Sequence, residues 1–260
     1  MQPALFVPHG APDLALSDIP AALFLRSFFD ARAKPRGVVV ISAHWQSRGL
    51  RLTTASTLDT IHDFGGFGSA LHTLRYPATN TPSLVAAVRE ALEASDLIVR
   101  DDPRRGLDHG AWIPLRLMLP EAEVPITQLS LPVAASPQDL FRIGQALASL
   151  ASQDILVIGS GATVHNLRQI APEGTPPPQW ATGFDDWVEQ ILAQRDWSSL
   201  VAFQATDLGH ISHPTPEHFQ PLIIIAGICS AHPAGVMRNL HRSYSYGSIG
   251  MAAWEVQDAL

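Results

Sequence analysis

Histidine is the residue type in this sequence with the greatest capacity for chemistry. The chain holds 11 histidines in 260 residues, and three of them follow segments that read as strands: His9 in FVPHGAP, His44 in VVVISAHW and His165 in ILVIGSGATVHN. A neutral imidazole can transfer a proton near neutral pH and can bind iron(II), zinc and related ions. One histidine after a strand is more often a hydrogen-bonded structural residue. Three in the same topological position favour a metal or catalytic site.

The elements that must position these side chains follow an alternating pattern. Short runs rich in β-branched residues predict strands at residues 4–7, 38–42, 126–131, 155–159 and 200–203. Helical periodicity appears between and after them, at residues 19–32, 82–94, 112–119, 137–151 and 183–195. Thr81 before Pro82 and Ser136 before Pro137 are typical helix starts. The segment SYSYGSIGMAAWEV predicts a terminal strand.

This alternation predicts an α/β fold, with one domain over residues 1–260 and a central, largely parallel or mixed sheet flanked by helices. In such sheets ligands bind beyond the carboxyl ends of the strands. Side chains that follow separate strands therefore converge there, as a metal requires.

A third ligand is expected from the motif HPTPEH at residues 213–218. Pro216 suits the first turn of a helix, and His218 follows it. Glu217 is the competing candidate, because a carboxylate commonly completes a two-histidine iron site. Two more histidines, His62 in IHDFGGF and His109 in LDHGAW, lie in loops beside glycine and aromatic residues.

Composition and charge exclude several functional classes. The net charge of -7 argues against a nucleic-acid footprint, which needs clustered lysine and arginine. The longest apolar run, PLIIIAGICSA, is too short to cross a bilayer, and the N-terminal MQPALFVPHGAP lacks the basic region of a signal peptide. The single cysteine, Cys229, cannot form an internal disulfide, so we expect a reduced thiol and a cytoplasmic protein.

Motifs for other catalytic chemistries are incomplete. GSGATVHN follows a strand but lacks the spacing of a dinucleotide fingerprint and the lysine of a P-loop. The sequence has no G-x-S-x-G elbow, and Cys229 lies in an apolar run. A nucleotide site or a serine or cysteine nucleophile is therefore not expected.

The motifs PHGAP, SAHW, IHDFGGF, LDHGAW, GSGATVHNL and HPTPEH, in this order, resemble those of the DOPA-dioxygenase type of class III extradiol ring-cleaving dioxygenases. The resemblance spans nearly the whole chain and implies that family's single α/β domain. It implies metal ligation by His9, His44 and His218, a catalytic His165 close enough to count as a fourth ligand, a substrate- or oxygen-contacting His109, and a pocket entrance lined by His62 and Asp63.

The implied reaction opens a catechol ring with O2 beside the diol, giving a muconic semialdehyde. Iron(II) would be the cofactor, although zinc(II) can occupy such a ligand set. His165 would act as general base and acid, and His109 would hydrogen-bond to oxygen. The first motif departs from the family's Ser-His-Gly-Ser-Pro, because Pro8 and Ala11 stand in place of both serines. Partners that orient a ligand tune the metal, so affinity or substrate choice can differ here.

Two alternatives remain open from the sequence. One is a zinc hydrolase on the same scaffold, with metal-bound hydroxide as nucleophile. The other is a protein that binds a metal or ligand without turnover. The sequence does not fix the native metal, the particular catechol, or whether the chain forms a homo-oligomer.

Overall fold

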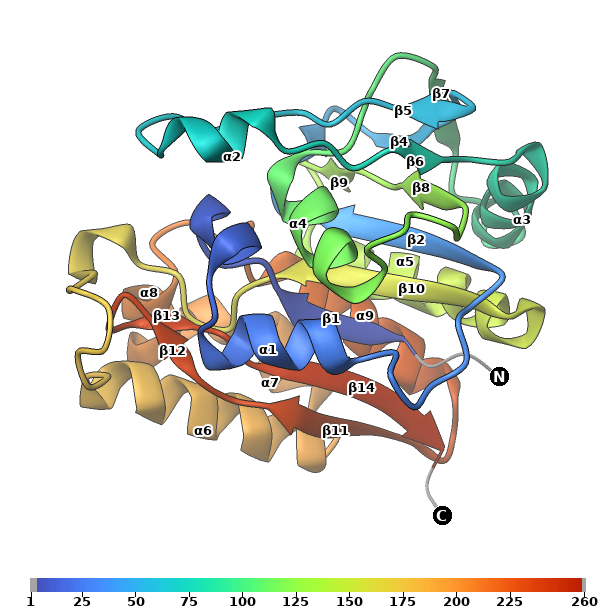
Figure 1. Ribbon diagram of the computed structural model, residues 1–260. Coiled ribbons are helices and arrows are strands. Elements are labelled where there is room, and N and C mark those ends of the chain that lie inside the picture. Colours follow the sequence, from blue (N-terminus) through green and yellow to red (C-terminus); the bar gives the residue numbers. More distant parts are fainter. Residues whose placement is uncertain (1–3, 259–260) are drawn as a thin grey trace.

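The computed structural model describes residues 4–258 and is built around a six-stranded sheet with the order β11-β14-β1-β10-β2-β8 (Figure 1). The parallel strands are β1 (Leu5–Pro8), β10 (Ile155–Gly161), β2 (Gly37–Ser42) and β8 (Ile126–Gln128). Strand β14 (Ala253–Asp258) pairs antiparallel with β1, and β11 (Gly235–His241) pairs antiparallel with β14. The sheet is mixed, and the prediction of an α/β fold with a central mixed sheet is confirmed.

The central strands are buried on both faces, because helices cover each side of the sheet (Figure 1). One face packs against α1 (Pro20–Ser27) and α4 (His109–Met118), and its strand residues are Leu5, Val7, Val38, Val40, Leu156 and Ile158. The other face packs against α3 (Pro82–Glu93), α5 (Pro137–Leu147), α6 (Gln179–Ala193) and α9 (Gln220–Ala231), and its strand residues are Phe6, Val39, Ile41, Ile155 and Val157. Successive side chains of a strand point to opposite faces, so these strands read as continuous apolar runs.

Helix α9 carries the longest apolar run of the sequence and is buried along most of its length. It packs closely on α5 through two glycines. A Cβ added at Gly144 would lie 2.0 Å from the carbonyl oxygen of Ile224, and one at Gly227 would lie 2.1 Å from that of Phe141. Any side chain at either glycine would push the two helices apart. Within residues 4–258, no helix is both long and apolar enough to cross a membrane.

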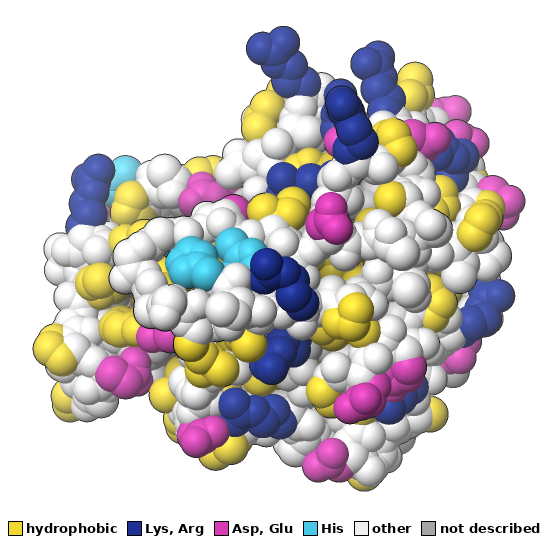
Figure 2. Space-filling model, turned by 45° about the horizontal axis from the view of Figure 1, so that its top comes forward, with side chains coloured by type: hydrophobic (Ala, Val, Ile, Leu, Met, Phe, Trp, Pro, Cys, Tyr) yellow, Lys and Arg dark blue, Asp and Glu magenta, His cyan; other side chains and the backbone are white. Residues whose placement is uncertain are grey.

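Shorter elements complete the structure. The paired short strands are β3 (Gln46–Ser47) with β9 (Leu131–Pro132), β4 (Leu50–Thr53) with β7 (Val99–Asp102), β5 (Thr57–Leu58) with β6 (Ala78–Thr79), and β12 (Tyr244–Ser245) with β13 (Ile249–Gly250). The short helices are α2 (Ser69–Thr73), α7 (Trp197–Val201), α8 (Asp207–Ser212), and the 3-10 helices η1 (Pro12–Leu16), η2 (Ala148–Gln153), η3 (Leu167–Gln169) and η4 (Phe203–Ala205). Figure 2 shows basic and acidic side chains interspersed on one face of the molecule.

The expected helix starts are confirmed. Thr81 accepts a hydrogen bond from the backbone N–H of Leu84 at 3.3 Å at the start of α3. Ser136 forms a capping box with Asp139 at the start of α5. The other three predicted helices are also present, with boundaries that differ by a few residues. The predicted terminal strand is present as β14, and the residues before it form the separate antiparallel pair β12 and β13.

Some predicted elements were wrong. The strand expected at residues 200–203 is helical, because α7 and η4 cover this region. Asp196 caps α7 by accepting from the backbone N–H of Ser199 at 3.1 Å, and Leu200 and Phe203, three residues apart, are both buried. A spacing of three fits one face of a helix. The strand expected at 126–131 divides into β8 and β9, and β11 was not predicted.

Candidate metal centre

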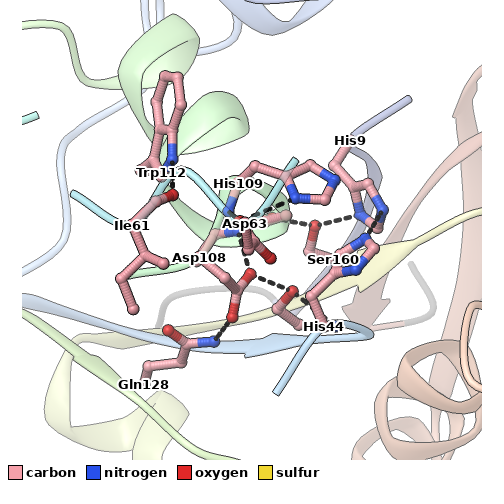
Figure 3. Close-up of polar contacts among 12 residues, drawn as sticks. His9, His44, Ile61, Asp63, Asp108, His109, Trp112, Gln128 and Ser160 are labelled. Atoms are coloured by element: carbon pink, nitrogen blue, oxygen red, sulfur yellow. Dashed lines mark hydrogen bonds and ion pairs between the residues drawn. The ribbon is translucent and has the colours of Figure 1, made fainter. Parts of the chain in front are cut away.

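The strand ends bring the predicted histidines together, because β1, β10 and β2 are neighbours in the sheet. His9 follows β1 and its backbone N–H donates to the carbonyl of Gly161 at the end of β10, at 3.3 Å. The Nε2 atoms of His9 and His44 lie 3.0 Å apart (Figure 3). His218 joins them, so that one ring nitrogen from each of the three histidines lies within 4.8 Å of the others.

A fixed hydrogen-bond chain orients His9, which is 1% exposed. Its Nδ1 lies 3.0 Å from Oγ of Ser160 (Figure 3). The hydroxyl of Ser160 donates to the carbonyl of Gly110. A carbonyl only accepts, so the Ser160 oxygen must accept from Nδ1–H of His9. The Nε2 atom of His9 therefore carries a lone pair directed toward His44.

The turn that carries His44 is held from the start of α4. The backbone N–H of His44 donates to Oγ of Ser42 at 3.2 Å, and the hydroxyl of Ser42 donates to Oδ1 of Asp108 at 2.6 Å. Asp108 is fully buried and its second oxygen accepts from Nε2 of Gln128 at 2.6 Å. A Cβ at Gly110 would lie 2.4 Å from Oγ of Ser42, so only glycine fits there. The position of His44 thus depends on Asp108 and Gly110, both in the DHGAW motif.

His218 lies in the turn before α9 and is 5% exposed. Its Nδ1 donates to Oε1 of Glu217 at 3.1 Å, and the same oxygen accepts from the hydroxyl of Thr215 at 2.9 Å. Glu217 is thus placed to fix the ring of His218. The expected helix start at Pro216 was wrong, because α9 begins at Gln220 and Pro216 belongs to the preceding turn.

His165 stacks on His218, with ring centroids 3.5 Å apart and an angle of 8° between the planes. The backbone N–H of His165 donates to the carbonyl of Ser212 at 3.0 Å, which fixes this segment against α8. His165, Glu217 and His218 form a second group of potential metal ligands. His165 thus borders the cluster made by the other histidines.

His109 begins α4 and is held by Asp63. The Oδ1 atom of Asp63 accepts from the backbone N–H of His109 at 2.9 Å and from its Nδ1 at 3.0 Å (Figure 3). Burial alone raises the pKa of the Asp63 carboxyl, but the bonds from His109 outweigh burial and lower this pKa to about 2. The carboxylate is therefore ionised at neutral pH. The ring of His109 lies 4.0 Å from that of His44, centroid to centroid.

His62 has a different environment. Its Nε2 donates to the carbonyl of Leu74 at 3.0 Å, and Arg75 lies beside it. A cavity beside the histidine cluster is lined by Phe64 and Phe67, and its described lining includes neither His62 nor Asp63. The entrance role of His62 and Asp63 remains a prediction.

Burial keeps the clustered imidazoles neutral. It lowers the pKa of His9 and of His218 well below 6.5, and neighbouring histidines lower both further. It also lowers the pKa of His44 to about 4, with His109 adding to the effect, and that of His165 to about 4. Neutral imidazoles offer the lone pairs that a metal needs.

The spacing of these imidazoles fits a metal. The Nε2 atoms of His9 and His44, 3.0 Å apart, are close enough to bind one cation together when both are deprotonated. Metal–nitrogen bonds of about 2.1 Å at right angles place two ligand atoms roughly 3.0 Å apart. The donors are also oriented by further hydrogen bonds, as metal-binding histidines commonly are. The cluster therefore fits a metal in donor type and spacing.

A cavity of about 720 Å³ opens onto the cluster, and its lining includes His44, His109, His165 and His218. Aromatic and aliphatic side chains such as Phe64, Phe67 and Leu167 form other parts of the wall. A smaller apolar chamber of about 260 Å³ adjoins it and reaches His9. Cavities of this size, largely apolar with a few polar groups, suit small organic ligands.

Residues 25–253 match the family described as the catalytic LigB subunit of aromatic ring-opening dioxygenase. The chain belongs to this family. It is 35% identical over 258 residues to the 4,5-DOPA dioxygenase extradiol of Beta vulgaris, with 94% of each chain covered. It is 38% identical over 232 residues to the 4,5-DOPA dioxygenase extradiol of Escherichia coli (strain K12), covering 86% of this chain and 84% of the relative.

A solved structure has the same fold as this LigB family protein. The crystal structure of an uncharacterized protein from Escherichia coli K12 has a TM-score of 0.83 and 30% sequence identity, covering 99% of this chain and 100% of that one. The family and these relatives identify the chain as an aromatic ring-opening dioxygenase.

Sequence reasoning missed the residues that hold the histidines. Asp108 directly precedes His109 and caps α4 by accepting from the backbone N–H of Ala111 at 3.2 Å, a pattern that the letters DHGA signal. Ser160 has a weaker signal, a small polar residue between two glycines at a strand end. The contact of Asp63 with His109 joins residues far apart in the chain, and no local pattern reveals it.

Proposed function

We propose that this protein cleaves the ring of a catechol with O2 beside the diol, forming a muconic semialdehyde. The observation that carries the proposal is a set of neutral, inward-facing imidazoles beside a cavity of suitable size for an aromatic ring. The names of the relatives in Beta vulgaris and Escherichia coli support a catechol such as DOPA or another single-ring catechol. The free, buried Cys229 is consistent with a reducing, cytoplasmic setting.

The family's enzymes are metal-dependent, and the cluster offers a potential metal site. In our proposal His9, His44 and His218 would hold iron(II). Bound iron(II) supplies positive charge that favours ionised catechol hydroxyls, together with the redox chemistry that zinc(II) lacks. Glu217 orients His218 in this scheme, since its carboxylate already accepts from Nδ1 of that ring.

His165 is the proposed general base and acid. Burial lowers its pKa to about 4, so the ring is neutral at pH 7 and one ring nitrogen has a free lone pair. The charge of Glu217 raises this pKa and so favours the protonated ring when a proton is taken up. The backbone of His165 is fixed by Ser212, and its ring lies against His218. In the described part of the chain its ring makes no hydrogen bond, so its nitrogens are available to substrate.

His109, which lines the same cavity, is proposed to contact substrate or oxygen. Asp63 holds the proton on Nδ1 of His109, so Nε2 of the neutral ring is an acceptor. When Nε2 takes a proton, the ionised Asp63 stabilises the resulting imidazolium. In that state His109 donates a hydrogen bond to an oxygen on which negative charge develops.

The test is anaerobic reconstitution with iron(II), followed by oxygen and a panel of catechols, with visible absorbance reporting a ring-opened product. We expect His44→Ala to lose metal, and His165→Ala to keep metal but lose turnover. His210→Ala, at an exposed position on α8, serves as the control. Normal cleavage by His165→Ala would refute its role. No product from any catechol, with tight zinc binding, would favour a hydrolase or a binding protein.

A further inference from the structure

The wall of the cavity beside the histidine cluster carries a cation that the proposed chemistry does not use. Among the described residues that line the cavity, Arg168 is the only lysine or arginine. It is exposed, and no described carboxylate forms an ion pair with it. A guanidinium in a ligand cavity without an acidic partner is suited to bind an anion from outside the protein.

The backbone beneath Arg168 is fixed, although its side chain is exposed. Its N–H donates to Oδ1 of Asn166 at 3.1 Å, and Nδ2 of Asn166 donates to the carbonyl of Ile211 at 2.6 Å. Asn166 is only 6% exposed. On the other side, the hydroxyl of Ser248 donates to the carbonyl of Gln169 at 3.0 Å. The short helix η3 is therefore held at both ends, which presents the guanidinium from a defined place and reduces the entropy lost on binding.

The same segment joins the cation to the reaction centre. Arg168 follows His165 by three residues, and both side chains line one cavity. Leu167 and Phe67 supply apolar surface in that cavity, which suits the aromatic part of a substrate. Glu217 is the one carboxylate among the described residues of this lining, and it already accepts from His218 and Thr215. An anionic substituent would avoid Glu217 and find its favourable partner at Arg168.

We propose that Arg168 binds an anionic group, in the simplest case a carboxylate, on the side chain of the catechol, and that it makes the enzyme selective for acidic catechols. This inference rests on the proposed function, because it names the residue that binds the side chain of the same catechol whose diol end reacts at the histidine cluster. Arg168 acts as a specificity-determining residue. It takes no part in proton transfer.

The test uses two substrates that differ in charge at nearly equal size, 3-(3,4-dihydroxyphenyl)propanoate and its primary amide. Anaerobic dissociation constants are measured by calorimetry on iron-loaded protein, and kcat and KM are measured with oxygen. We expect the wild type to bind the acid roughly tenfold more tightly than the amide, because a charge-assisted hydrogen bond at an exposed position is partly screened by solvent and salt. In Arg168→Gln we expect this preference to vanish through weaker binding and a higher KM for the acid, with kcat and the amide values unchanged.

Two further variants separate specific binding from general charge. Arg168→Lys keeps the charge but loses the planar fork, so it should retain part of the preference. Arg100→Gln removes an exposed arginine on β7, outside the cavity, and should behave as wild type. Equal affinity of the wild type for acid and amide, or equal losses for both in Arg168→Gln, would overturn the inference. If no catechol is cleaved, the proposed function fails, but the anaerobic binding preference still decides the role of Arg168.

Discussion

Replacement of His165 by glutamine should flatten the acid limb of the stability profile of the metal-free protein. The folded state lowers the pKa of His165 from 6.5 to about 4, chiefly by burial. Between these values the unfolded chain binds a proton at this residue and the folded chain does not. The stability contributed by the neutral ring is therefore fully present above pH 6.5 and is lost as the pH falls toward 4.

The magnitude follows from the two pKa values. Each tenfold change in a proton equilibrium is worth about 1.4 kcal/mol, so a fall from 6.5 to about 4 corresponds to about 3 kcal/mol of unfolding free energy. Such a loss is a large part of the roughly 5–15 kcal/mol that holds a typical domain folded. The His165→Gln variant cannot take up this proton, so between pH 7 and pH 4 its stability should fall by about 3 kcal/mol less than that of the wild type.

The assay is urea unfolding in a chelating buffer at half-unit intervals from pH 7.5 to pH 4, with fluorescence detection. His210→Gln, at an exposed position on α8, is the matched control and should follow the wild-type profile, because an exposed ring loses little hydration on folding. Parallel profiles for wild type and His165→Gln would refute the reasoning. They would show that the ring is hydrated in the folded state and does not need to be neutral.

Three further substitutions test the supports of the cluster. Ser160→Ala removes the acceptor that holds the proton on Nδ1 of His9, so metal affinity should fall about 10- to 100-fold in a competition titration with a chelator; unchanged affinity would contradict this. Gly110→Ala should cost roughly 1–3 kcal/mol in urea unfolding, because the new Cβ overlaps the hydroxyl of a neighbouring serine; wild-type stability would show that the turn can yield. Asp63→Asn should keep its metal, measured by atomic absorption, but lower kcat about 100-fold, because the imidazolium of His109 loses its carboxylate; wild-type kcat would exclude His109 as a proton carrier.

The sequence predicted the convergence of histidines because the cause is topological. His9, His44 and His165 follow strands β1, β2 and β10, and parallel neighbouring strands present their carboxyl ends at one edge. That rule needs only the positions of the strands.

Other features depend on contacts that no local pattern encodes. Asp63 lies in a loop and accepts a hydrogen bond from His109, and no periodicity in the sequence links these two residues. At the segment around Leu200, a local pattern was present but predicted the wrong element. Its apolar residues suited a strand, but the capping side chain of Asp196 and packing at helical spacing decided for a helix. Propensity in a short run is weaker than the packing of the whole domain.

The order of the cluster residues along the chain has a consequence for biosynthesis. His9 and His44 emerge early from the ribosome, whereas His218 directly precedes the last helix, α9. Since chains are made from the N-terminus at roughly 5–20 residues per second, the early histidines wait roughly 10–40 seconds for their partner. A nascent chain thus cannot complete the cluster until the four parallel strands and most of the helices have been translated, with β11 and β14 still to come. Acquisition of a metal there would mark a nearly finished protein.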